Sequence, residues 1–150
     1  MLTKALNKTY FAISDSLNPY HLFDRWLNPY VHTLQIDLYG HPLIIQWTRR
    51  AQKELDRRKQ TLFVEMQLTF SCVVKKRVIF HDNYDRGSVS VFEKLALDFR
   101  VVEPASCDPE EFARSYPERR ELKSGAARRM NAKKLVFDYK KNQWMGEFFI

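Results

Sequence analysis

The sequence predicts an α+β protein formed by one domain of residues 1–150. We expect a twisted antiparallel sheet of about five to seven strands, with a few short helices packed on one face. Apolar and polar residues alternate over long stretches, which is the period of a half-buried strand. The strand patterns lack the regular strand-helix-strand alternation that builds a parallel sheet. The length of 150 residues, with 45% hydrophobic residues, suits a single hydrophobic core.

The longest strand pattern covers residues 62–74 and predicts the central strand. Apolar residues occupy every second position from Val64 onward, and Glu65, Gln67 and Thr69 lie between them. This spacing predicts one face toward the core and one face toward solvent. Residues 78–80 either continue this strand or begin a partner strand after the basic residues 75–77.

Two helices are predicted from capping signals in the first half of the chain. Asn18 followed by Pro19 is a favourable helix start, so a helix is expected over residues 19–27. Its aromatic residues are expected to pack in the core or in an interface rather than to form a ligand cage. Thr48 is expected to cap a helix over residues 49–60. A short amphipathic helix is also expected near residues 3–14.

The remaining strands are predicted as hairpins. Residues 33–38 and 43–47 flank a turn at residues 39–42, and residues 134–139 and 143–149 form a terminal hairpin with a packed apolar C-terminus. Residues 89–102 form either one bulged strand or two shorter strands.

The segment between the last two strand regions is predicted to contain little regular structure. Asp108 and Pro109 provide a cap and a first helical residue, so a short helix should run to about residue 116. Residues 117–133 hold almost no large apolar residue, which indicates a mobile basic loop or a weakly formed helix.

Positive charge is concentrated in two segments of this basic chain. The formal net charge is +7; residues 48–60 hold six basic and two acidic residues, and residues 117–134 hold seven basic and two acidic residues. Such segments can bind an anionic partner, although many charged runs are only solvated surface. The candidate anion-binding residues are Arg49, Lys53, Arg57, Arg128, Arg129, Lys133 and Lys134.

Catalytic and metal-binding motifs are absent from the sequence. The four histidines have no metal-ligand spacing, and there is no glycine-rich phosphate loop or nucleophile elbow. One diffuse alternative site remains on the polar face of the predicted sheet, where carboxylates could supply general acid and base groups. Its residues are Asp37, Glu65, Asp98 and Asp138.

These observations favour a non-enzymatic binding protein that engages nucleic acid or another polyanion through its basic segments. The alternatives are an enzyme that uses the carboxylate site, and a structural or homo-oligomeric scaffold in which the aromatic N-terminal stretch or a long strand pairs across a two-fold axis. We expect no cofactor, no metal and no membrane partner. With two cysteines and no secretion signal, the expected location is the cytoplasm.

Overall fold

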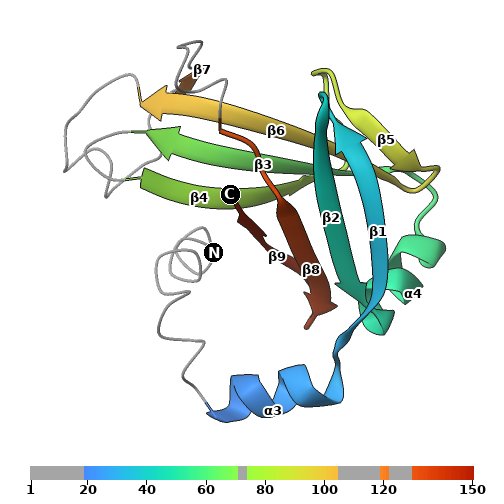
Figure 1. Cartoon of the computed structure of the whole chain (residues 1–150). Coiled ribbons are helices and arrows are strands. Elements are labelled where there is room, and N and C mark those ends of the chain that lie inside the picture. Colours follow the sequence, from blue (N-terminus) through green and yellow to red (C-terminus); the bar gives the residue numbers. More distant parts are fainter. Residues whose placement is uncertain (1–18, 71–73, 105–118, 122–129) are drawn as a thin grey trace.

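The computed structural model describes residues 19–70, 74–104, 119–121 and 130–150, and these form an α+β structure that is mostly β (Figure 1). The helices expected near residues 3–14 and 108–116 lie outside the described residues. Of the expected loop at residues 117–133, the structure describes residues 119–121 and 130–133.

The described strands form two sheets. The first sheet has the order β1-β2-β8-β9, and the second has the order β4-β3-β6-β5, with β7 paired to β6. The strands of the first sheet are β1 (Tyr30–Leu38), β2 (His41–Thr48), β8 (Lys134–Lys140) and β9 (Gln143–Phe149). Those of the second are β3 (Leu62–Phe70), β4 (Val74–His81), β5 (Val89–Phe92), β6 (Leu95–Pro104) and β7 (Arg119–Glu121).

The prediction of one antiparallel sheet is therefore wrong, because both sheets are mixed. β2 pairs with β8 in parallel, and β3 pairs with β6 in parallel. The prediction assumed that strands adjacent in sequence are adjacent in space. Instead, the connection after β4 passes both β3 and β6 before β5 begins at the opposite edge, so β6 returns in the direction of β3.

The three hairpin regions are close to their predicted positions. β1 and β2 form an antiparallel hairpin around Tyr39 and Gly40, whose positive φ angles of 53° and 86° suit a two-residue turn. β8 and β9 pair around Lys141 and Asn142 in the same way. Residues 89–102 contain two strands, β5 and β6, and residues 78–80 belong to β4, which is the antiparallel partner of β3.

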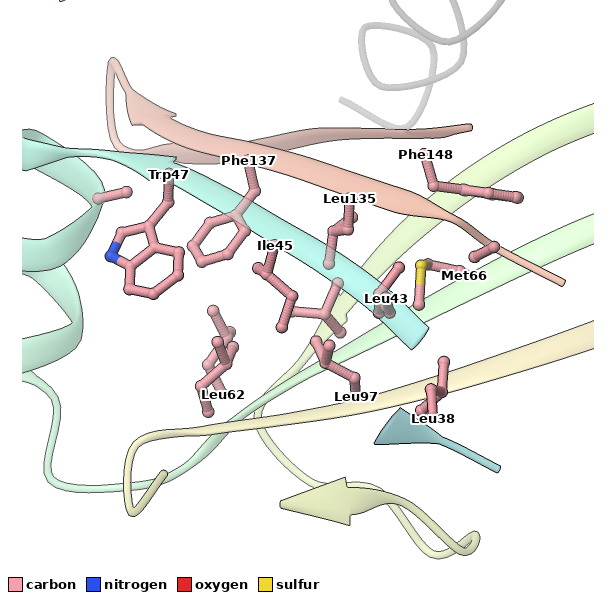
Figure 2. Packing of buried hydrophobic residues seen from close by; sticks show 14 of the residues in the cluster. Leu38, Leu43, Ile45, Trp47, Leu62, Met66, Leu97, Leu135, Phe137 and Phe148 are labelled. Carbon is pink, nitrogen blue, oxygen red and sulfur yellow. The ribbon is translucent and has the colours of Figure 1, made fainter. Parts of the chain in front are cut away.

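The core lies between the two sheets. Figure 2 shows Ile45 and Phe137 of the first sheet facing Leu62 and Leu97 of the second, and all four side chains are fully buried.

The periodicity of the central strand is confirmed for β3, where Val64, Met66 and Leu68 are buried. It is wrong for Val74, because the strand ends at Phe70 and Val74 is an exposed residue at the start of β4. Leu34 of β1 is exposed as well.

The last three residues of the chain differ in their burial. Phe148 is fully buried, whereas Phe149 and Ile150 are exposed. The expectation of a packed apolar C-terminus is confirmed for Phe148 and wrong for the other two, because alternate residues of β9 face opposite sides of the sheet and Ile150 lies beyond its end.

The polar face of β3 is not the solvated surface that the alternation predicted. Glu65, Gln67 and Thr69 are each less than 10% exposed, as are the apolar residues of the opposite face. Glu65 accepts hydrogen bonds from Gln67 of its own strand and from His81 and Arg100 of the two neighbouring strands, so its buried carboxylate is satisfied. Burial on both faces is typical of a central strand in a mixed sheet.

The helix α4 (Arg49–Arg57) packs on the first sheet. Thr48 caps it as predicted, since its hydroxyl oxygen accepts a hydrogen bond from the backbone N–H of Ala51 at 3.2 Å. Ala51 and Leu55 anchor the buried side of the helix. The helix ends at Arg57, three residues before the predicted boundary.

The helix α3 (Pro19–Leu27) has the predicted bounds but not the predicted packing. None of its residues is buried, and Figure 1 shows it lying below the sheets rather than across a face of either one. The prediction that it covers a sheet face is wrong. The stripe that it turns toward the rest of the protein is polar and makes ion pairs instead of apolar contacts.

Candidate functional site

Three of the candidate anion-binding residues form a basic ridge on α4, defined here as Arg49, Lys53 and Arg57. All three side chains are exposed, because Ala51 and Leu55 hold the opposite side of the helix in the core. Residues four apart are separated by about 6 Å along a helix axis, so the ridge presents cations over about 12 Å.

Within the described part of the chain, the charges of the basic ridge are largely uncompensated. Arg57 lies 3.5 Å from the carboxylate of Glu54, and its side chain is 80% exposed, so solvent screens that pair. Among the residues that the structure describes, neither Arg49 nor Lys53 makes an ion pair. Asp56 is also exposed on α4, and it accepts a hydrogen bond from Gln52 at 2.9 Å.

The structure does not unite the basic ridge with the second basic segment. Arg128 and Arg129 lie outside the described residues. Lys133 is exposed and Lys134 is partly buried at the start of β8. Lys134 is the register partner of Ile44, which lies four residues before the end of β2. The basic ridge begins just after β2 ends, so Lys134 lies about 13 Å away from that end of the strand.

The four carboxylates of the alternative site do not converge. Glu65 and Asp98 are register partners on β3 and β6, and both are buried. Asp37 belongs to the other sheet and is exposed, where it accepts a hydrogen bond from the backbone N–H of Gly40 at 2.6 Å. Asp138 is also in the other sheet, inside a separate ionic network.

Glu65 accepts hydrogen bonds from three side chains. One carboxylate oxygen lies 2.8 Å from both Gln67 and Arg100, and the other lies 2.8 Å from Nε2 of His81. Burial opposes the charge and raises the pKa of Glu65, but the bonds from Gln67, His81 and Arg100 outweigh burial and hold the pKa below its ordinary value. Glu65 is therefore ionised at neutral pH.

Asp98 is bound by two tyrosine hydroxyls from distant parts of the chain. Tyr39, in the β1–β2 turn, donates to Asp98 Oδ1 at 2.6 Å, and Tyr84, in the β4–β5 connection, donates to Oδ2. Burial, together with the charge of Asp98, raises the pKa of Tyr84. A shallow, open depression of about 640 Å³ adjoins this group, lined in part by Tyr39, Arg86 and Arg100.

This arrangement suits a structural polar network better than an acid and base pair. A general acid needs a carboxyl group that keeps its proton near neutral pH, whereas the pKa of Glu65 is lowered. The oxygens of Glu65 and Asp98 already accept hydrogen bonds from protein donors. The sequence analysis missed His81 and Tyr84, and no local motif marked them. His81 contacts Glu65 from the end of β4, which pairs with β3, and Tyr84 contacts Asp98 from the β4–β5 connection.

A second ionic network surrounds Asp138. Its carboxylate accepts bonds from Thr48 at 2.5 Å, from two nitrogens of Arg50 at 2.8 and 2.5 Å, and from Arg25 at 3.0 Å. Burial raises the pKa of Asp138, but the bonds from Arg50 and Thr48 outweigh it and lower the pKa overall. The network ties β8 to both helices.

Asp24 extends this network to α3. It pairs with Arg50 at 2.8 Å and with Lys140 at 3.1 Å. The hydrogen bond from Arg50 is the main reason that the pKa of Asp24 lies far below its ordinary value. Arg50 is thus occupied inside the protein and is not part of the basic ridge.

Within the described part of the chain, no group of three or more His, Cys, Asp or Glu side chains is arranged to hold a metal ion. No helix among these residues has the length and apolar character needed to cross a bilayer. No protein family matches the sequence, and neither the curated proteins nor the solved structures yielded a match.

Proposed function

We propose that the protein is a non-enzymatic binding protein that engages nucleic acid through the basic ridge on α4. The observation that carries this proposal is the exposure of Arg49, Lys53 and Arg57 on one outward side of a helix whose other side is fixed in the core. A rigid helix holds the cations in place, so less side-chain and backbone freedom is lost on binding than in a flexible segment.

The way the protein uses its other arginines supports the proposal. Arg50 and Arg100 are committed to buried carboxylates, and Arg58 pairs with Asp82. Of the three ridge cations, Arg57 alone makes an ion pair with another described residue, Glu54 at 3.5 Å, and its side chain stays 80% exposed. Charge that does not stabilise the fold is available to a partner.

The dimensions of the ridge suit a nucleic-acid backbone. One strand of a duplex carries a phosphate about every 3.4 Å along the helix axis, so a 12 Å ridge spans about three or four phosphates. Contacts of this kind position a protein without reading sequence. We therefore expect binding with little base specificity.

The test is binding to mixed-sequence DNA and RNA across a salt series. Contacts with several phosphates release counterions, so the affinity should fall steeply as salt rises. A variant measures how much the second basic segment contributes to this salt dependence. It removes four basic residues together: Arg128, Arg129, Lys133 and Lys134. A variant with an unchanged slope would restrict the interface to the ridge.

Two results would count against the proposal. Undetectable binding at low salt would show that the ridge is only solvated surface. Binding that does not weaken with salt would show that phosphate contacts do not provide the affinity, and the proposal would then fail even though a complex forms.

A further inference from the structure

The helix α3 has its amphipathic character inverted relative to an ordinary surface helix. The three partly buried residues of α3 are polar: His21, Asp24 and Arg25. Asn28, directly after the helix, continues this stripe and is also polar and partly buried. The residues on the other side are large, apolar and exposed. A surface helix usually does the opposite, burying its apolar stripe and exposing its polar one.

The outward residues form what we call the α3 surface. Their exposed fractions are 82% for Tyr20, 57% for Leu22, 59% for Phe23, 74% for Trp26, 56% for Leu27 and 44% for Val31 of β1. Contiguous apolar surface of this size is uncommon on a monomeric protein and marks an interaction site.

Ion pairs hold α3 in this orientation. Asp24 is bound by Arg50 and Lys140, and Arg25 is bound by Asp138. The guanidinium of Arg25 also lies 4.2 Å from the centre of the Tyr30 ring. Because the polar stripe is fixed inward, the apolar side faces outward.

The α3 surface contains a pair of exposed aromatic rings and a hollow. Phe23 and Trp26 pack against each other with ring centres 6.1 Å apart. Beside them lies a hollow of about 300 Å³ lined by Trp26, Leu27, Asn28, Pro29, Val31 and Arg49. A surface that carries exposed aromatic rings next to a hollow can be complementary to a copy of itself, as a two-fold interface requires.

The available area matches that of a stable dimer. With about 150 to 250 Å² for each large aromatic side chain, the exposed parts of these six residues amount to roughly 800 Å² per copy. A standard protein interface buries about 800 Å² on each partner. The exposed large side chains are apolar, which is typical of homodimer interfaces rather than of transient polar ones.

We propose that the protein forms a two-fold homodimer in which the α3 surfaces of two copies pack against each other. The dimer buries Trp26 and Phe23 of each copy. It also brings Arg49 of each copy to the rim of the interface, because Arg49 lines the same hollow as Trp26. This inference does not depend on nucleic-acid binding.

The experiment measures molar mass by light scattering over a dilution series and records tryptophan emission on the same samples. Trp26 is the exposed tryptophan, whereas Trp47 is buried and Trp144 packs against Tyr139 and Phe80. The dimer mass should therefore be accompanied by blue-shifted emission that moves to the red as the dimer dissociates. Added salt should strengthen the dimer, since both copies carry a net charge of +7.

Matched variants locate the interface. Phe23→Ser with Trp26→Ser should give a monomer that still unfolds cooperatively, because neither side chain is buried in the fold. Trp26→Phe should keep the dimer and lose the emission change. Val74→Ser, which alters an exposed residue of β4, is the control and should leave the dimer intact.

Three results would overturn the proposal. One is a monomer at every concentration with Trp26 emission typical of water. Another is a monomer with blue-shifted Trp26 emission, which would show that the same chain covers the surface. The third is a dimer that survives in the Phe23→Ser, Trp26→Ser variant, which would place the interface elsewhere.

Discussion

Asp138 connects three parts of the chain through a single buried carboxylate. Its side chain is 3% exposed, and Arg50, Arg25 and Thr48 all donate to it. Thr48 is also the N-cap of α4, so one hydroxyl links the start of that helix to β8. Removing such a carboxylate would leave buried donors without an acceptor, which costs more than the bonds themselves contribute.

We predict that Asp138→Ala lowers the free energy of unfolding by about 3 kcal/mol, since breaking one partner of a buried ion pair costs roughly 3 to 5 kcal/mol and Arg50 keeps its contact with Asp24. Asp85→Ala, at an exposed loop residue, is the control and should change stability by less than about 0.5 kcal/mol. Urea unfolding measures both. Equal effects in the two variants would contradict the structural role of Asp138.

The lowered pKa values of Asp24, Glu65 and Asp138 predict a loss of stability in acid. Each group has a lower pKa folded than unfolded, so its contribution is fully present above the unfolded pKa, near 3.8 for aspartate and 4.5 for glutamate. The contribution is lost as the pH falls through these values toward the folded pKa. Denaturant unfolding from pH 6 to pH 3 should show this decrease, with a shallower slope in Asp138→Asn.

A free energy of unfolding that is constant or rises between pH 5 and pH 3 would contradict the ionic networks. An Asp138→Asn slope equal to that of the unchanged protein would restrict the effect to Asp24 and Glu65.

At the scale of single elements, the sequence predicted where helices and strands lie better than what they contact. The cap at Thr48 and the buried pair Ala51 and Leu55 fixed the position and outward side of α4, because these signals are local. The signals that predicted the bounds of α3 were also local. Its inverted orientation was not predictable, since it depends on Asp138, more than 100 residues further along the chain.

Gly146 of β9 lies at the contact between the two sheets. A Cβ there would meet the Phe80 ring at 3.0 Å, a Val78 methyl at 3.2 Å and the Val136 carbonyl oxygen at 3.3 Å. The strand alternation alone gave no reason for glycine at this position. The reason is the close approach of β4 to β9.

We predict that Gly146→Val destabilises the protein by about 2 kcal/mol, because overpacking a close contact typically costs 1 to 3 kcal/mol. The matched control is Gly87→Val, where a Cβ would meet nothing within 4 Å. Thermal or urea unfolding compares the two. If Gly87→Val were as costly as Gly146→Val, the close approach of the two sheets would not explain the difference.

At the scale of the whole molecule, the alternation of apolar and polar residues correctly predicted a mostly β structure but could not give the strand order. Glu65 and Asp98 were expected to share a sheet face, and they do. Asp37 and Asp138 were expected on that same face and are in the other sheet. A pattern of period two identifies the face of each strand but not which sheet the strand joins.

The proposed binding of nucleic acid depends on where the net charge of +7 lies on the molecule. We propose that the cations that bind nucleic acid are those of the basic ridge on α4, rather than the positive charge of the surface as a whole. A diffuse positive charge would also attract a polyanion, because long-range attraction depends on the total charge. The two cases are separated by comparing variants that have equal net charge.

The decisive measurement compares two triple variants that each lower the formal net charge from +7 to +4. One replaces the ridge residues Arg49, Lys53 and Arg57 by Gln, and the other replaces the exposed residues Lys76, Arg86 and Lys141 by Gln. We predict that the ridge variant shows a salt-dependence slope for nucleic-acid binding that is smaller by about 2 to 3, while the control keeps a slope close to that of the unchanged protein. If the salt-dependence slope fell equally in both variants, or fell further in the control, the result would contradict binding through α4.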